Sequence, residues 1–177
     1  MLQPPKVKEA NTFALRKGHD NYVTQADFRA FLDSIYHFDS WDPCPINEKG
    51  IREYDGLGKT PSWVKSYFYN PPYSDVTPWL ENSIADWRRG VLSCALLKAD
   101  TSTVWMHDLV FPYARPIWVR GRLSFDGKNP APFNSCVAVF EPGLKVPQQR
   151  MMYKTGAAAY RDGIGTWHIF PEVQAVR

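Results

Sequence analysis

The chain has 177 residues, a mass of 20.3 kDa and a formal net charge of +3, with 44% hydrophobic and 22% charged residues. This length fits one domain with a sizeable core, and the mild positive charge is compatible with a polyanionic partner without indicating one. No run approaches the roughly 18 apolar residues of a membrane span, and no apolar signal-peptide segment opens the chain, so we expect no membrane contact.

Three cysteines, Cys44, Cys94 and Cys136, are widely spaced along the chain. Neither a disulfide framework nor a zinc-ligand spacing fits them. We therefore expect reduced thiols, a cytoplasmic location and no metal site. The sequence contains no internal repeat and no low-complexity tract.

The first 21 residues are polar and lack periodicity, so we expect residues 1–21 to form an N-terminal arm. Order is predicted to begin at Thr24, because Thr24 and Asp27 have the spacing of a capping box. Apolar residues then recur at helical spacing up to about Tyr36, which predicts a helix with one buried face. The residues of that face are Phe28, Phe31, Leu32 and Ile35.

A short strand is predicted from Phe38, and Pro43 ends it, which leaves Asp42 at its carboxyl end. The turn-rich segment 46–63 follows and contains Asp55 before a glycine. Asp42 could hydrogen-bond a ribose or a ligand amine, or it could cap a turn. In the same way, Asp55 could accept from an adenine amine or serve only as a turn residue. The residues alone leave both choices open.

The most informative stretch is Asn70-Pro71-Pro72-Tyr73-Ser74, which follows a predicted strand over residues 64–69. Two consecutive prolines cannot continue a β-ladder, because neither has a backbone N–H. We expect the chain to leave the sheet in a stiff turn that places the Tyr73 ring beyond the strand, where open α/β sheets bind ligands. The amide oxygen of Asn70 and a proline carbonyl can accept hydrogen bonds from an amine, while Tyr73 stacks on its ring. A proline-rich surface turn is the alternative.

The rest of the chain alternates between helical and extended patterns. We expect helices over 77–90 and 101–110 and strands over 91–98, 117–125 and 135–140. The strand over 91–98 is nearly all apolar, as in a strand buried on both faces. A turn-rich link between the last two strands favours an antiparallel pair. This order predicts a three-layer α/β fold with a mostly parallel sheet and an antiparallel edge.

Two regions towards the end of the chain leave alternatives open. Arg120 and Arg122 would share one face of the strand over 117–125, where they either contact an anion or lie on a solvated edge. Glycines break up residues 144–177, and the sequence does not place Trp167 or Phe170 in the fold. This segment could pack as a flap or form a partner surface.

Taken together, these segments resemble the phage-type, Dam-like DNA N6-adenine methyltransferases, which use S-adenosylmethionine. The resembling segments, in chain order, are Tyr22–Phe28, Asp42–Pro45, Asp55–Leu57, Asn70–Ser74, Ala99–His107, Arg120–Phe125 and Ala131–Phe140. The Asn-Pro-Pro-Tyr turn also occurs in methyltransferases of glutamine and RNA, whereas the last three blocks are more specific. The resemblance implies a Rossmann-like methyltransferase fold, with a catalytic domain over 22–143 and a C-terminal extension over 144–177.

The resemblance also implies a cofactor site. Its residues would be Tyr22, Thr24, Asp42, Pro43, Cys44, Asp55 and Asn70. By this analogy, the Thr24 segment and the Asp42 loop would hold the methionine and ribose parts of S-adenosylmethionine, and Asp55 would accept from its adenine amine. Many methyltransferases have a Gly-x-Gly loop after the first strand, but here the first glycine after Asp42 is Gly50.

Catalysis would depend on Asn70, Pro71, Pro72 and Tyr73. The side-chain oxygen of Asn70 and the carbonyl of Pro71 would hold the two hydrogens of the adenine amine and stabilise its developing positive charge. The base must be flipped out of the duplex, and stacking on Tyr73, worth about 1–3 kcal/mol, would offset much of that cost. Residues expected to bind the substrate are Tyr73, Ser74, Trp105, Arg120, Arg122 and Phe125.

A separate target-recognition domain does not fit in 177 residues. Base reading is therefore expected from loops around 126–134, from 144–177 or from a second subunit, and a homodimer stays open. RNA adenine or a protein glutamine amide is the alternative substrate, and an inactive nucleic-acid-binding relic is the alternative to an enzyme. A phage-encoded chain would act in the host cytoplasm, and a restriction-modification partner stays open.

Overall fold

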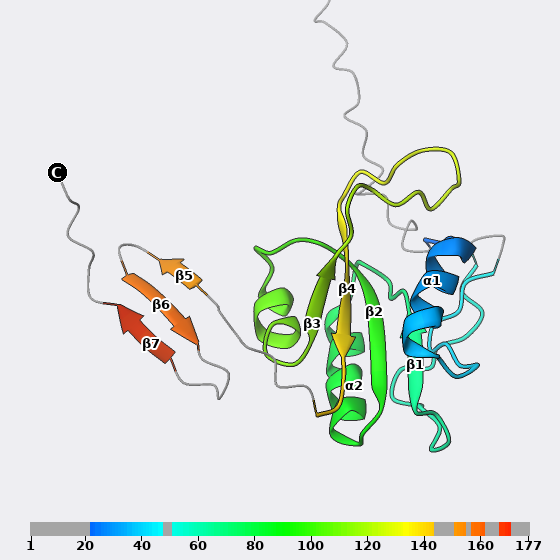
Figure 1. The fold of residues 1–177 in the computed structure, drawn as a ribbon, viewed down its shortest axis with the longest axis horizontal. Coiled ribbons are helices and arrows are strands. Elements are labelled where there is room, and N and C mark those ends of the chain that lie inside the picture. Colours follow the sequence, from blue (N-terminus) through cyan, green and yellow to red (C-terminus); the bar gives the residue numbers. More distant parts are fainter. Residues whose placement is uncertain (1–21, 48–50, 144–150, 155–156, 162–166, 171–177) are drawn as a thin grey trace, which may run out of the picture.

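The computed structural model describes residues 22–47, 51–143, 151–154, 157–161 and 167–170, so the arm predicted over 1–21 lies outside it. The helices are α1 (Ala26–Tyr36), α2 (Thr77–Arg88) and a short π-helix, η2 (Met106–Val110). The strands of the main sheet are β1 (Ser66–Tyr69), β2 (Leu92–Lys98), β3 (Arg115–Trp118) and β4 (Ser135–Phe140) (Figure 1). Within these ranges, none of the helices is long and apolar enough to span a bilayer.

The main sheet has the strand order β1-β2-β4-β3. β1 and β2 are parallel, whereas β4 is antiparallel to both of its neighbours, β2 and β3. The sheet is therefore mixed: the predicted antiparallel pair of its last two strands is confirmed, whereas the prediction of a mostly parallel sheet was wrong, because two of its three strand pairings are antiparallel. Burial explains the order, because all six residues of β4 are buried and β3 is partly exposed. The apolar β4 occupies an interior position, and β3 takes the edge.

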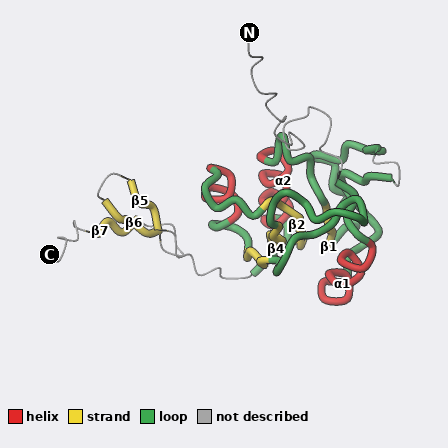
Figure 2. Tube along the Cα trace, turned by 90° about the horizontal axis from the view of Figure 1, so that it is seen from above, coloured by secondary structure: helices red, strands yellow, loops and turns green. Residues whose placement is uncertain are grey.

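Side chains of β2 alternate between the two faces of this sheet. Cys94 and Leu96 pack in one buried cluster with Leu32 of α1. Ala95 and Leu97 pack in a second cluster with the buried side chains of α2 and η2. Figure 2 shows α1 and α2 on opposite sides of the sheet. The prediction of a strand buried on both faces is therefore confirmed.

The C-terminal region contains a second sheet. Its strands are β5 (Met151–Lys154), β6 (Ala157–Arg161) and β7 (Trp167–Phe170). They pair antiparallel in the order β5-β6-β7. The described parts of 144–177 are therefore β-structure, which the glycine-broken sequence did not predict.

Helix α1 begins one residue later than predicted. Gln25 is its N-cap residue, and no side chain caps it. The Thr24 hydroxyl instead accepts a hydrogen bond from the Asn70 side chain at 3.2 Å, so the predicted capping box does not form. The predicted buried face is also only partly correct, because Phe31 and Ile35 are exposed.

The strand predicted from Phe38 is replaced by a hydrogen-bonded loop. The N–H of Asp39 donates to the Ser66 carbonyl, and its carboxylate accepts from the N–H groups of Lys65 at 2.6 Å and Ser66 at 3.1 Å. These two backbone donors lower the pKa of Asp39. The side chain thus fixes this loop to the start of β1 instead of a strand ladder.

Two later elements are shorter than predicted. The helix predicted over 101–110 reduces to residues 104–110, and its end is a π-helix in which the N–H of Phe111 donates to the Met106 carbonyl. The strand predicted over 117–125 is β3, which ends at Trp118. The residues from 119 to 134 then form a long loop, in which Asp126 accepts from the N–H groups of Lys128 and Asn129, and these bonds lower its pKa.

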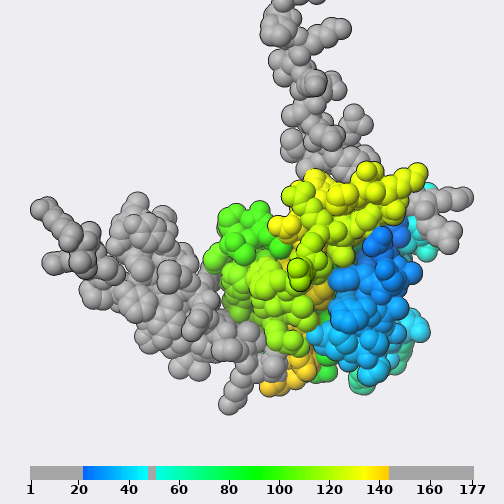
Figure 3. Space-filling model, turned by 45° about the horizontal axis from the view of Figure 1, so that its top comes forward, coloured from blue at the N-terminus to red at the C-terminus, as the bar shows by residue number. Residues whose placement is uncertain are grey.

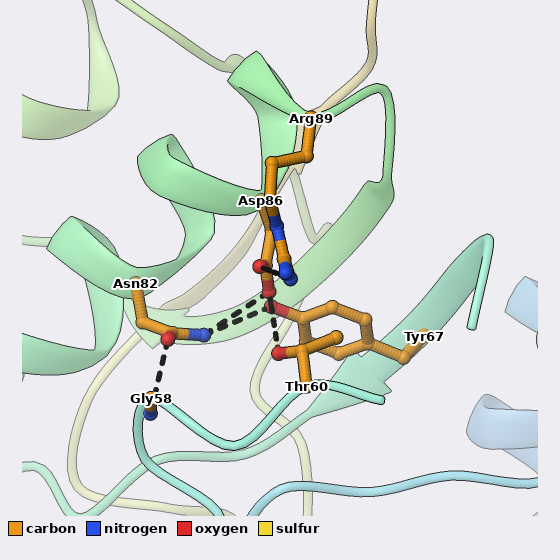
Figure 4. A network of polar contacts seen from close by, with 6 residues as sticks. All are labelled: Gly58, Thr60, Tyr67, Asn82, Asp86 and Arg89. Carbon is orange, nitrogen blue, oxygen red and sulfur yellow. Dashed lines mark hydrogen bonds and ion pairs between the residues drawn. The ribbon is translucent and has the colours of Figure 1, made fainter. Parts of the chain in front are cut away.

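A buried carboxylate, Asp86 of α2, holds the loop before β1 (Figure 4). It accepts hydrogen bonds from the Thr60 hydroxyl at 2.7 Å and the Tyr67 hydroxyl at 2.7 Å. Asn82 donates to the same carboxylate at 3.1 Å, and its own oxygen accepts from the N–H of Gly58 at 3.0 Å. The loop over 58–60 is therefore fixed to α2 by side-chain hydrogen bonds.

We expect Asp86→Ala to lower the free energy of unfolding by at least about 2 kcal/mol, because the buried hydroxyls of Thr60 and Tyr67 each lose an acceptor at about 1–3 kcal/mol. Urea unfolding measures this. Arg115→Met is the control: Arg115 pairs with Glu141, both side chains are at least 40% exposed, and an exposed ion pair contributes about 0–1 kcal/mol. Equal losses in the two variants would contradict the network's importance.

Candidate functional site

The Asn70–Ser74 turn follows β1 directly, as the two prolines predict. Asn70 is buried at 6% exposure, and Pro71 is buried beside it. Pro72 and Tyr73 are half-buried, and Ser74 is exposed. The turn thus passes from the core to the surface over five residues, with the amide of Asn70 at its buried end.

Two hydrogen bonds set the orientation of the Asn70 side chain. Its Nδ2 donates to the Tyr22 carbonyl at 2.6 Å and to the Thr24 hydroxyl at 3.2 Å. Because a carbonyl only accepts, Nδ2 must face Tyr22, and Oδ1 must face away. That Oδ1 atom is buried and has no hydrogen-bond partner. A buried acceptor without a donor costs about 1–3 kcal/mol and is the kind of exception that indicates a functional site.

A hollow of about 160 Å³ lies beside Asn70. Five residues predicted to bind the cofactor line it: Tyr22, Thr24, Asp42, Cys44 and Asn70. The structure therefore brings together three segments that are far apart in the sequence. The cofactor role of these residues stays a prediction.

Asp42 lines the hollow and also forms a turn. Its Oδ1 accepts from the N–H of Cys44 at 2.8 Å. Burial raises the pKa of Asp42, and the Cys44 N–H and the positive charge of Arg29 only partly oppose the rise. The two alternatives for Asp42, a turn residue and a polar group facing a ligand, are therefore compatible in this geometry.

Arg29 also lines the hollow, although the sequence did not mark it as a site residue. Its guanidinium carbon lies 4.6 Å from the ring centroid of Phe38 and 4.7 Å from that of Phe68. Its Nη1 is buried without a partner, and burial lowers the pKa of the group. In the sequence, Arg29 is marked only by its place directly after Phe28, a residue of the predicted apolar face. Basic residues occur at such positions on many surface helices.

Asp55 is exposed and does not line the hollow. Its Oδ1 accepts from the N–H of Leu57 at 3.1 Å, which matches its alternative as a turn residue. The next residue, Gly56, contacts the Asp42 loop, because its N–H donates to the Pro43 carbonyl at 2.6 Å. A Cβ on Gly56 would lie 2.8 Å from the Pro43 backbone. Pro43 itself is buried under this turn and does not line the hollow.

Aromatic rings surround Tyr73. Its ring centroid lies 5.3 Å from that of Tyr22 and 5.5 Å from that of Phe133, and Phe125 lies 5.0 Å from Tyr22. Lys98 Nζ lies 5.1 Å from the Tyr73 centroid. Burial raises the pKa of the Tyr73 hydroxyl. The expectation that Tyr73 projects freely beyond the strand was therefore wrong, because rings of Tyr22 and of Phe133 in the 119–134 loop contact it. Figure 3 shows this loop, in yellow, lying beside the segment of α1, in blue.

The other residues predicted to bind substrate lie in different places. Arg120 and Arg122 are exposed in the 119–134 loop and do not share a strand face, because β3 has already ended. Gly121 between them has a φ of 83°, which turns the chain. Trp105 is half-buried against the cluster on the α2 side of the sheet. Of these residues and Phe125, only Phe125 therefore lies in the aromatic cluster around Tyr73, through its contacts with Tyr22 and Phe133.

A family model described as DNA N-6-adenine-methyltransferase (Dam) matches residues 52–164, well over half of the chain. The chain belongs to this family. Membership confirms the resemblance and supports methylation of adenine in DNA as the general activity, with DNA as the expected substrate. The matched range includes the Asn70–Ser74 turn, begins after Arg29 and Asp42, and continues beyond residue 143. Neither the curated proteins nor the solved structures searched contain a match.

We expect Gly56→Ala to lower the free energy of unfolding by about 1–3 kcal/mol, since the added methyl group overlaps the backbone of Pro43. It should also weaken binding of S-adenosylhomocysteine, because the displaced loop carries Asp42. Gly58→Ala is the control: no atom lies within 4 Å of a Cβ there, but its φ of +70° strains alanine, at about 1–2 kcal/mol. Urea unfolding and calorimetric titration measure both effects. Equal loss of binding in both variants would contradict a specific contact.

We expect Asp42→Asn to become more stable relative to wild type as the pH rises. The folded-state pKa of Asp42 lies above the ordinary value of 3.8, so the folded protein holds this proton more tightly than the unfolded chain. Wild-type stability therefore falls as pH rises from 3.8 through the raised pKa, whereas asparagine does not titrate. Urea unfolding between pH 4 and pH 7 should show the variant gaining on wild type. If the difference in free energy of unfolding between the variant and wild type stays constant across this range, the pKa of Asp42 is not raised by burial.

Proposed function

We propose that the chain transfers the methyl group of S-adenosylmethionine to the N6 amine of adenine in DNA, with the base flipped into a site beside Asn70. The observation that carries this proposal is the buried and unpartnered Oδ1 of Asn70 at the end of β1. When bound, S-adenosylmethionine supplies an electrophilic methyl group on its sulfonium. The residues around the hollow then have to place and activate the amine.

Asn70 activates the amine through its side-chain oxygen. The adenine amine is a poor nucleophile, because its lone pair is delocalised into the ring. In our proposal, Asn70 Oδ1 and the Pro71 carbonyl accept hydrogen bonds from the two N–H groups of the amine. They stabilise the positive charge that grows on its nitrogen. Because the Tyr22 carbonyl already fixes the amide, Asn70 needs no reorientation at the moment of reaction.

Tyr73 offers a stacking surface that Tyr22 now occupies. A flipped adenine stacks on Tyr73 only if the Tyr22 ring gives way. An aromatic pair contributes about 0.5–1.5 kcal/mol beyond its burial, whereas base stacking contributes about 1–3 kcal/mol. The exchange therefore favours the base and offsets part of the cost of flipping.

The residues around the hollow fit one end of the cofactor. We assign Thr24, Asp42 and Cys44 to the methionine end, since they are polar groups beside Asn70. Asp42 supplies a carboxylate suited to a positively charged group. We assign no cofactor contact to Asp55, because it does not reach the hollow.

The arrangement of helices supports a Rossmann-like, three-layer assignment. Helix α1 packs on one face of the sheet, and α2 and η2 pack on the other. The Asn70 turn lies at the carboxyl end of β1, which pairs in parallel with β2, and open α/β sheets bind ligands at such ends. The exposed Arg120 and Arg122 on the 119–134 loop are suited to phosphate contacts.

Asn70→Ala should reduce N6-methyladenine in the DNA of expressing cells by about 10²-fold or more, the usual effect of removing one preorganised group that stabilises transition-state charge. Nucleoside mass spectrometry of DNA and RNA from the same cells measures the product and its carrier. We expect the modified base in DNA from cells that express the wild-type chain.

The matched control is Asn82→Ala. It removes another asparagine amide, one that hydrogen-bonds to Asp86 and Gly58 away from the hollow. This variant should be less stable than wild type but should keep methyl transfer below its unfolding temperature. Equal product from wild type and Asn70→Ala would remove Asn70 from the mechanism, and product in RNA alone would overturn DNA as the substrate.

A further inference from the structure

The hollow beside Asn70 is lined by groups of both charges. Asp42 supplies a carboxylate, and Arg29 supplies a guanidinium. Its volume of about 160 Å³ is smaller than the roughly 300–1,000 Å³ of pockets that enclose a whole small ligand. The hollow is therefore suited to one end of a ligand, and the two charges suit an end that is a zwitterion.

The guanidinium of Arg29 is held in place by aromatic rings, but its hydrogen-bond donors are not satisfied. The rings of Phe38 and Phe68 fix its guanidinium, with centroids at 4.6 and 4.7 Å. Its Nη1 is buried without a partner, and within the described ranges its side chain makes no hydrogen bond or ion pair. A stacked guanidinium with unused donors presents the planar fork that binds carboxylates in a bidentate manner.

Asp42 influences Arg29 from a distance without pairing with it. The charge of each side chain shifts the pKa of the other. In the described part of the chain, however, Asp42 and Arg29 do not form an ion pair. The Asp42 carboxylate instead accepts from the N–H of Cys44. Each charge is thus left to interact with an opposite charge on a ligand.

The second arginine near this site, Arg52, has a structural contact. Its Nη1 donates to the Cys44 carbonyl at 2.8 Å. Arg52 itself does not line the hollow. Its buried Nη2 has no partner, but the hydrogen bond to Cys44 fixes the side chain to the loop. Arg29 is therefore the better placed of the two arginines for a ligand in the hollow.

We infer that Arg29 binds the α-carboxylate at the amino-acid end of S-adenosylmethionine, while Asp42 faces the α-ammonium group. This inference rests on the proposed function, and it makes Arg29 a cofactor-specificity residue contributed by α1. The carboxylate supplies the missing partner for the Arg29 donors, and the ammonium supplies the opposite charge for Asp42. Both residues lie before residue 52, where the range matched by the family model begins.

The test compares two ligands that differ only in the carboxylate: S-adenosylhomocysteine and its decarboxylated analogue. Isothermal titration calorimetry of the full chain measures both dissociation constants in wild type and in Arg29→Met, which keeps the apolar stem. Wild type should bind S-adenosylhomocysteine about 10- to 100-fold more tightly than the analogue, in line with a hydrogen-bonded charge pair. Arg29→Met should lose this preference and keep its affinity for the analogue.

The matched control is Arg115→Met, because Arg115 pairs with Glu141 at 3.4 Å at the exposed edge of the sheet. This variant should keep the full preference for the carboxylate. Retained binding of the analogue by Arg29→Met also shows that the variant is folded.

Four outcomes would overturn the inference, and the last of them would overturn the proposed function as well. Equal binding of the two ligands by wild type removes the carboxylate contact but leaves the proposed function intact. An unchanged preference in Arg29→Met assigns the contact to another residue. Arg29→Met could also lose affinity for both ligands equally. If Arg29→Lys then restores the affinity for both ligands but not the preference for the carboxylate, Arg29 has only a packing role. Absence of binding by wild type to either ligand overturns the proposed function itself.

Discussion

The hydrogen bond from Asn70 Nδ2 to the Tyr22 carbonyl determines the chemistry available at this site. It joins the segment before α1 to the turn after β1, and it leaves Oδ1 as a buried acceptor. The Thr24 hydroxyl reinforces the same orientation and is therefore not used to cap α1. Since a helix cap usually contributes about 1 kcal/mol, the fold gives up helix stability to orient one amide.

The Asp42 loop is positioned without the glycine-rich loop that many methyltransferases have. Close packing from other segments replaces it: Gly56 lies against Pro43, and Arg52 donates to the Cys44 carbonyl. The thiol of Cys44 in turn donates to the Asn70 carbonyl at 3.4 Å. A glycine is still needed for a close backbone approach, but it comes from a different turn. The sequence therefore shows the Asp42 segment and the Asp55–Leu57 turn as two separate motifs. It does not show that the turn supports the Asp42 loop.

Local sequence patterns predicted the elements that local physics determines. The apolar run of β2, the proline-led start of α2 and the two prolines after β1 each specify their structure within a few residues. The interior position of β4 and the end of β3 depend on which strand buries more surface, and a single strand's sequence does not show that. In the same way, the position of Arg29 between Phe38 and Phe68 depends on how α1 packs on the sheet.

Two aspartates, the buried Asp86 and the partly buried Asp42, differ in how their charge is matched. Asp86 accepts from Thr60, Tyr67 and Asn82 and pairs with Arg89, so its charge is matched inside the fold. Asp42 receives one backbone N–H from Cys44, and burial raises its pKa, so its charge costs stability. The unmatched groups of Asn70 and Arg29 lie around the same hollow. Unsatisfied polarity is tolerated where a ligand supplies the missing partners, and this hollow brings an acceptor, Asn70 Oδ1, and a donor, Arg29 Nη1, to one place.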